Sequence, residues 1–242
     1  MKLKLVALLG IFCLVAGCDI TAQETIVHDA NAQVRTVGAF TGVEVGGAMV
    51  VYISQGKTQA VAVSASDEKY VAKIKTEVKN GVLYIHPESG AWNGWNWGNK
   101  NIKAYVTVTE LNNLEVNGAS TVQVSGSIHV KQLNMEVSGA SSFKGALAGS
   151  SINLEATGAS SVTVSGSVDV FNVEASGASS VKGYDLTTAT CNAEASGASG
   201  ISITVTKELS AEASGASSIG YKGSAVAKNI ETSGASSIKR KD

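Results

Sequence analysis

The chain has 242 residues, with 19 lysines and arginines against 20 aspartates and glutamates, and only 16% of its residues are charged. This balance argues against a nucleic-acid-binding protein, which normally carries a basic stripe, and an apolar content of 44% argues against a disordered chain. With 26 glycines, one proline and 5% aromatic residues, the composition favours β-structure with small side chains inside.

The N-terminal residues are similar to a bacterial lipoprotein signal. Lys2 and Lys4 precede an apolar run that ends at Ala16, too short for a membrane span of roughly 20 residues. Small residues directly before Cys18 resemble a lipobox, which implies lipid on the Cys18 thiol and cleavage before it. We therefore expect a signal peptide over residues 1–17, a tether over 18–33, and membrane attachment through the lipid.

The lipid would place the protein in the cell envelope, at the outer membrane or cell surface, and the periplasmic face remains an alternative. An ordinary cleaved signal with a secreted product is the other interpretation. After processing, Cys191 would be the one cysteine besides the lipidated Cys18. An intramolecular disulfide is then not expected, and Cys191 is interpreted as a small core residue.

Residues 34–110 are predicted to be an N-terminal β-rich part of the domain. Asn80-Gly81 stands between two alternating segments and is typical of a two-residue hairpin turn. The expected elements are a first rung over 43–53, a strand over 61–65, a short helical turn over 67–74, a hairpin over 76–86 and a strand over 102–109.

A tryptophan-rich loop is predicted over residues 87–100. It holds all three tryptophans of the chain, Trp92, Trp95 and Trp97, among glycines and asparagines. Tryptophan offers a large rigid surface with a polar handle, which suits stacking on sugar rings. The alternative is a cap that buries the rings over an open end of the fold, so these residues are candidate ligand-binding residues only.

Residues 111–242 consist of a repeat marked by the tetrapeptide Gly-Ala-Ser with a preceding Asn, Ser or Thr. Its glycines stand at 118, 139, 158, 177, 197, 215 and 234. A second glycine-serine punctuation lies about midway between many of them, so each period is expected to hold two strands and two tight turns. The serine after each Gly-Ala is interpreted as a turn residue that bonds backbone groups, with an exposed hydroxyl array as the alternative.

Polar and apolar residues alternate with a period of two within each copy. A glutamate stands three residues before each glycine, and usually an asparagine stands two residues before the glutamate. Such alternation is typical of a strand with one buried face. The candidate polar stripe consists of Glu136, Glu155, Glu174, Glu194, Asn134, Asn153, Asn172 and Asn192.

The stripe has two interpretations. One is a ligand-facing or cation-facing surface, and the other is an outward polar column that keeps the face soluble and the register unique. Stacked carboxylates about 4.8 Å apart repel by about 0.9 kcal/mol per neighbouring pair in water before salt screening. The second interpretation is favoured.

These patterns predict an all-β fold, a single-stranded parallel β-helix or β-solenoid of two sheets with rungs of ~19–20 residues. Residues 34–242 would form one continuous domain, stacked along one axis. One internal column is expected to consist of Leu133, Ile152, Phe171, Cys191 and Leu209.

From about residue 35 to the C-terminus, the chain resembles the family of the putative auto-transporter adhesin, head GIN domain. The resemblance rests on Phe40-Thr41-Gly42-Val43-Glu44-Val45, on Gly81-Val82-Leu83-Tyr84-Ile85 and on the Gly-Ala-Ser repeats. It implies a pectin-lyase-like superhelix without that superfamily's catalytic residues, and a role in cell adhesion. The absence of a membrane-barrel anchor from this sequence leaves the lipid on Cys18 as the expected tether.

Residue patterns for catalysis, metals or cofactors are not found. His28, His86 and His129 are scattered without metal-ligand spacing, and the repeats lack the aspartates of calcium-binding β-rolls. We expect a non-catalytic protein without cofactors that contacts surface glycans or envelope proteins. The alternatives are a self-associating structural scaffold, hence a possible homo-oligomer, and, less favoured, a β-helix carbohydrate-active enzyme.

Overall fold

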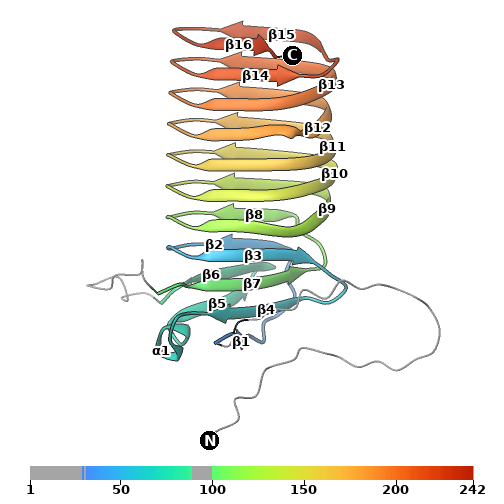
Figure 1. Ribbon diagram of the computed structural model, residues 1–242. Coiled ribbons are helices and arrows are strands. Elements are labelled where there is room, and N and C mark those ends of the chain that lie inside the picture. Colours follow the sequence, from blue (N-terminus) through green and yellow to red (C-terminus); the bar gives the residue numbers. More distant parts are fainter. Residues whose placement is uncertain (1–28, 30, 89–99, 242) are drawn as a thin grey trace, which may run out of the picture.

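The computed structural model describes residue 29, residues 31–88 and residues 100–241. The fold is 66% strand and 2% helix, a β-solenoid of about seven turns with rungs of about 19 residues (Figure 1). The predicted fold class is confirmed. The expected signal peptide, Cys18 and the three tryptophans lie outside the described residues.

Most rungs are single long strands that run along one face of the solenoid, bend, and return along the other face (Figure 1). Each pairs in parallel with the rungs before and after it. The strands of the repeat are β8 (Asn113–Val116), β9 (Thr121–Val137), β10 (Ser142–Ala156), β11 (Ser161–Ala175), β12 (Ser180–Ala195), β13 (Gly200–Ala213), β14 (Ser218–Lys222), β15 (Val226–Thr232) and β16 (Ser237–Arg240).

The two edges of the solenoid differ, which corrects the expectation of two tight turns per rung. At the midpoint of β10 and β11 the strand curves through Gly149 and Gly166, whose φ angles are +144° and +111°, while the pairing between rungs continues around the bend. Positive φ lets the chain turn within the ladder, so no separate turn forms. We call this side the rounded edge.

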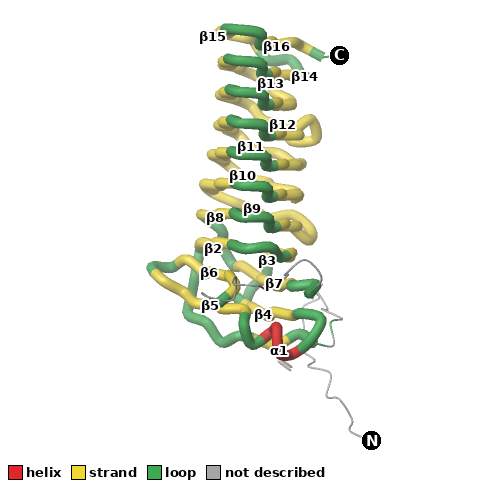
Figure 2. The backbone as a smooth tube through the Cα atoms, turned by 90° about the vertical axis from the view of Figure 1, so that its left-hand side faces the viewer, coloured by secondary structure: helices red, strands yellow, loops and turns green. Residues whose placement is uncertain are grey.

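The opposite, sharp edge is formed by the Gly-Ala-Ser turns, which stack in a straight file (Figure 2). The amide of Ala159 donates to the carbonyl of Gly139 at 2.8 Å, and the amide of Ala178 to that of Gly158 at 2.7 Å. The serines point inward and are buried, and the Ser179 hydroxyl donates to the Ala156 carbonyl at 2.9 Å. Ser199, Ser217 and Ser236 donate to backbone carbonyls in the same way, so the turn-residue interpretation holds for these turns. In the earlier turns, the hydroxyls of Ser120, Ser141 and Ser160 are buried without a hydrogen-bond partner.

The core lies between the two sheets and is built of columns of equivalent residues. The expected column forms, because Leu133, Ile152, Phe171, Cys191 and Leu209 are in register and fully buried. Burial raises the pKa of the Cys191 thiol to about 12. The thiol therefore stays protonated at neutral pH, as expected for a core residue.

The N-terminal part adds a rung out of sequence order. The expected rung consists of β2 (Gly42–Val45) and β3 (Val50–Gln55), and β6 (Val82–Pro87) and β7 (Lys103–Val108) form another beneath it. β2 pairs with β6 on one side and β8 on the other, and β3 pairs with β7 and β9. The rung predicted to be first is thus second in space.

Antiparallel strands close this end of the solenoid (Figure 1). β1 (Gln33–Val34) pairs with β4 (Ala60–Ser64), β4 with β7, and β5 (Ile74–Lys79) with β6. The β5–β6 turn has positive φ at Asn80 and Gly81, which confirms the predicted hairpin. The short helix α1 (Glu68–Val71), capped by the Asp67 side chain, joins β4 to β5.

The last rung has polar residues at two positions where earlier rungs are apolar, while the apolar side chains of Val226 and Ile230 are exposed there. Thr232 pairs with Ala213, and Arg240 pairs with Tyr221. The Arg240 guanidinium donates to the carbonyl of Gly223, and Lys228 pairs with Glu208 at 2.7 Å. Polar and charged side chains on the final strands disfavour the addition of another rung.

We predict that Gly158→Ala is far more destabilising than Gly126→Ala. Both glycines have φ near +75°, but a Cβ on Gly158 would lie 2.7 Å from the Gly139 carbonyl oxygen, whereas a Cβ on Gly126 meets nothing within 4 Å. Backbone strain alone should cost Gly126→Ala about 1–2 kcal/mol, and Gly158→Ala should lose clearly more. Urea unfolding monitored by circular dichroism measures both, and equal losses would contradict the stacked-turn explanation.

Candidate functional site

The candidate site is the outer surface of the sheet that contains β8 and the returning halves of β9 to β13. Register places the glutamates above one another and the asparagines above one another, while Met135 and Leu154 between them point into the core. We call this surface the Asn–Glu face. Its members are Asn113, Asn134, Asn153, Asn172, Asn192, Ser210, Glu115, Glu136, Glu155, Glu174, Glu194 and Glu212.

The asparagines are joined by side-chain hydrogen bonds. The amide of Asn153 donates to the Asn134 oxygen, that of Asn172 to Asn153, and that of Asn192 to Asn172, each at 2.8 Å. The backbone ladder fixes the spacing between successive rungs. At this spacing the side-chain amide of one asparagine can donate directly to the side-chain oxygen of the asparagine in the next rung. The ladder is therefore rigid, and it leaves one N–H of each amide for other partners.

The glutamates form a single file without cationic partners. Among the described residues, no salt bridge involves any glutamate of the Asn–Glu face. Burial, followed by the neighbouring carboxylates of Glu115 and Glu155, raises the pKa of Glu136. Burial and the same kind of repulsion raise the pKa of Glu44, one rung below Glu115. The face is thus acidic and rich in hydrogen-bond acceptors.

A groove of about 720 Å³ runs along this face between the two columns. Its walls are the asparagine and glutamate side chains, and its floor is the strand at Met135, Leu154 and Val173, whose side chains are buried on the other side of the sheet. The groove crosses several rungs, so it presents the same set of polar groups repeatedly along the solenoid axis. Such a surface suits an extended partner with hydroxyl or ammonium donors better than a single small molecule.

The structure brings all eight residues of the candidate polar stripe onto one face, as the alternation predicts, and their role in binding stays a prediction. Asn113 and Ser210 extend the groove. Ser210 occupies the position that is asparagine in the rungs before it. The sequence signal that could have identified it is its place two residues before Glu212. Below Glu44 the column continues with Tyr84 of β6, which sequence order does not reveal.

The opposite sheet carries lysines, which the sequence patterns did not single out. Lys144, Lys182 and Lys239 share one outward column, separated by Thr163, Ser202 and Gly220. Lys222 lies two residues along from this column. The lysines recur only in some rungs, so they give no regular signal.

The part of the chain that the structure describes was searched for metal-ligand clusters and for membrane-spanning helices. There, no group of three or more His, Cys, Asp or Glu side chains could hold a metal ion. Within the same residues, no helix combines the length and apolar character needed to cross a bilayer.

Comparison with known proteins places the chain among bacterial adhesin-like folds. Residues 39–225 match the family model described as "Putative auto-transporter adhesin, head GIN domain". A putative adhesin from Bacteroides fragilis has a similar structure, with a TM-score of 0.81 at 21% identity over 86% of this chain and 95% of that one.

Two structures from Parabacteroides distasonis are also similar. A putative adhesin gives a TM-score of 0.69 at 18% identity over 86% of this chain and 95% of that one. A putative lipid binding protein gives 0.66 at 21% identity over 88% and 97%. At these identities the likeness concerns the fold. No match was found among curated proteins.

We predict that Glu136→Gln stabilises the protein at neutral pH. The folded-state pKa of Glu136 is raised above its unfolded value. At a pH between these two values, the folded chain therefore keeps a proton that the unfolded chain has released. Its ionised carboxylate therefore lowers stability as pH rises through the window above the ordinary glutamate value. The variant should gain a few tenths to about 1 kcal/mol near pH 7, and lose this advantage below about pH 4.

Urea unfolding at several pH values measures this difference. Glu77→Gln is the matched control, because the Lys79 side chain lowers the pKa of Glu77 and the substitution should give no gain. A loss of stability in Glu136→Gln at neutral pH would contradict repulsion along the glutamate file.

Proposed function

The chain belongs to the family of the putative auto-transporter adhesin, head GIN domain, and on that premise we propose that it is a non-catalytic, adhesin-like protein of the cell envelope. Its contact surface in this proposal is the Asn–Glu face. The partners are surface glycans or envelope proteins that lie along the solenoid axis. Family membership agrees with a location at the cell surface or in the envelope.

The observation that carries the proposal is the groove between the asparagine ladder and the unpaired glutamate file. Its amides are held in place by one another, so a partner does not have to order them on binding. Every rung contributes one carboxylate and one polar side chain. Weak contacts can thus be multiplied along an extended partner.

The repetition of the face favours binding over catalysis. A glycosidase or lyase needs one pair of carboxylates with different environments, so that one acts as acid and the other as base or nucleophile. On the Asn–Glu face, Glu155 and Glu174 are equivalent in register and both are exposed. A β-helix carbohydrate-active enzyme is therefore the weaker alternative.

The proposed tether is lipid on Cys18, followed by residues leading to the solenoid. The argument rests on the small residues before Cys18 and the short apolar run at the N-terminus. Attachment at this end suits the arrangement of the ordered part. Asp29 accepts from the Tyr105 hydroxyl at 3.0 Å, and Asn31 donates to the Ala65 carbonyl at 3.1 Å. Both contacts lie at the closed end, which leaves the length of the solenoid to project away.

A binding test uses the triple variant Glu155→Gln, Glu174→Gln and Glu194→Gln on a glycan array and on whole cells. We expect at least about a tenfold loss of apparent affinity, equivalent to about 1.4 kcal/mol, because the acceptors of the groove are weakened. The control with the same change of charge is Glu110→Gln, Asp169→Asn and Glu208→Gln, at exposed or half-buried positions outside the Asn–Glu face.

Trp95→Ala tests the other predicted contact, which lies outside the described residues. Retained binding in the triple variant together with lost binding in Trp95→Ala, at unchanged stability, would move the contact surface to the tryptophan segment. Absence of binding to any glycan or cell surface would refute adhesion.

Protease treatment of intact cells tests the location. We expect the protein to be removed from the surface of wild-type cells, and the Cys18→Ala variant to be lost from the membrane fraction because no lipid can be attached. Immunoblotting of fractions before and after protease gives the result. Full protection of the anchored wild-type protein would instead place it on the periplasmic side.

A further inference from the structure

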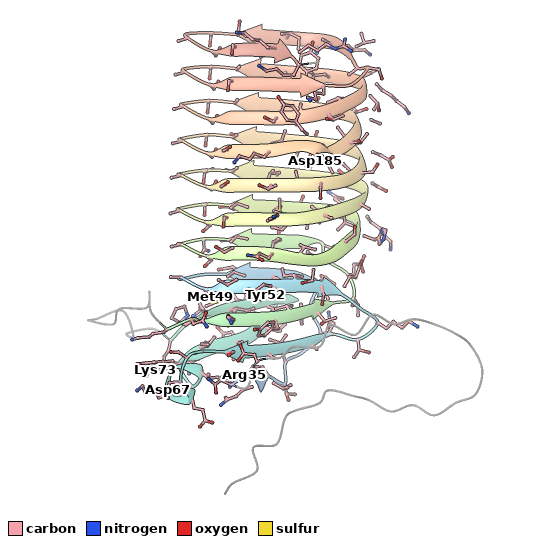
Figure 3. The ribbon with its side chains drawn as sticks, viewed as in Figure 1. Arg35, Met49, Tyr52, Asp67, Lys73 and Asp185 are labelled. Carbon is pink, nitrogen blue, oxygen red and sulfur yellow. The ribbon has the colours of Figure 1, made fainter. Side chains whose placement is uncertain are left out.

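The two faces of the solenoid carry opposite charge although the whole chain is nearly neutral, at −1. The Asn–Glu face presents glutamates in consecutive rungs. The opposite sheet presents lysines, and its acidic residue among the upper rungs, Asp185, lies toward the rounded edge (Figure 3). We call this second surface the Lys face, defined by Lys144, Lys182, Lys222 and Lys239, with the serines and threonines between them.

The lysines of the Lys face are available for a partner. Lys144, Lys182 and Lys239 are exposed, and no salt bridge among the described residues involves them or Lys222. Lys222 lies 5.2 Å from the centre of the Tyr184 ring, which holds it on the surface. Lower on the same sheet, Lys103 lies 3.8 Å from Asp29 and is not part of the set.

The charges on both faces follow the same spacing. Lys144 and Lys182 are two rungs apart, and so are Glu155 and Glu194 on the other face. Both pairs are set by the same backbone ladder, with about 4.8 Å per rung. Two copies placed side by side with parallel or antiparallel axes can therefore align several ammonium groups with several carboxylates at once.

We propose that the Asn–Glu face of one copy docks on the Lys face of a second copy, so that the solenoids associate side by side. The inference rests on the proposed function and names a partner protein for the same face. Docking of two different surfaces is heterologous, so association continues beyond a dimer into a row of copies, or into a ring if the rotation closes. The contact is lateral because the charged columns lie on the two sheet faces, and antiparallel strands close the N-terminal end.

Single exposed ion pairs are weak, so the number of pairs and the local concentration decide the outcome. Copies tethered to one membrane, or to two facing membranes, meet at a high effective concentration. Lateral association would then strengthen contact between neighbouring copies or neighbouring cells. The same charges also predict a strong dependence on salt.

The test is complementation between two variants of the full chain, purified as its host produces it and measured by sedimentation velocity. In the rungs of β10 to β12, Lys144→Glu with Lys182→Glu makes both faces acidic. In the same rungs, Glu155→Lys with Glu194→Lys makes both faces basic, since Glu174 alone remains between the two new lysines. Neither variant should self-associate, whereas their mixture should co-associate, because each basic face meets an acidic one. Wild-type association should fall severalfold between about 0.01 M and 1 M salt, where the Debye length shrinks from about 30 Å to about 3 Å.

A control separates docking from net charge. Lys131→Glu with Lys207→Glu makes the same change of charge at exposed sites beside the bend of the strands. This variant should self-associate as the wild type does. It should also associate with the basic variant no better than the wild type does. Circular dichroism confirms that each variant is folded. Equal loss of association in the control, or a mixture that stays monomeric, would overturn the inference.

The outcome for the proposed function is separate. A wild-type chain that stays monomeric at low salt but still binds glycans or cells refutes lateral docking and leaves adhesion in place. Co-association of the complementary variants without any binding to glycans or cells supports lateral docking and refutes adhesion to other ligands.

Discussion

The fold depends on the close contact of one Gly-Ala-Ser turn with the next. The amide of each alanine donates to the glycine carbonyl of the turn one rung below, as Ala159 does to Gly139 and Ala178 to Gly158. A Cβ at Gly158 would come within 2.7 Å of that carbonyl oxygen. Because only glycine allows this approach, the turns stack in one register. The stacked turns in turn fix which residues of neighbouring rungs lie above one another.

Register decides both the interior and the surface. Inside, it places Ile152 over Leu133 and Phe171 over Ile152, so that the core is a set of columns. Outside, it places amide over amide and carboxylate over carboxylate. The amides gain from this arrangement through hydrogen bonds. The carboxylates do not, because burial first and repulsion between neighbouring carboxylates second raise the pKa of Glu136. A surface that keeps an unfavourable file of charges is a reasonable place to look for a partner.

The ends of a solenoid are sheet edges, and the two ends of this protein differ. At the N-terminal end, β1, β4 and β5 pair antiparallel to their neighbours. At the other end, polar residues such as Thr232 and Arg240 occupy positions that are apolar in earlier rungs. The closed N-terminal end and the oppositely charged faces favour contact with a partner at the sides of the solenoid.

The repeated part of the fold follows from the pattern of residues along the chain. Alternation with a period of two and glycines 18 to 21 residues apart were enough to predict the solenoid, the core column through Cys191 and the shared face of Glu155 and Asn153. These features repeat along the chain, so neighbours in sequence pattern are neighbours in space.

The pairing of segments that are not equivalent in the repeat became known from the three-dimensional structure. It placed the β6–β7 rung beneath β2 and β3, made the second turn a continuous bend, and gathered Lys144, Lys182 and Lys239 opposite the glutamates. The physical reason is that long-range pairing, unlike alternation, leaves no period in the sequence. A strand such as β2 has the same pattern whichever strands pair with it.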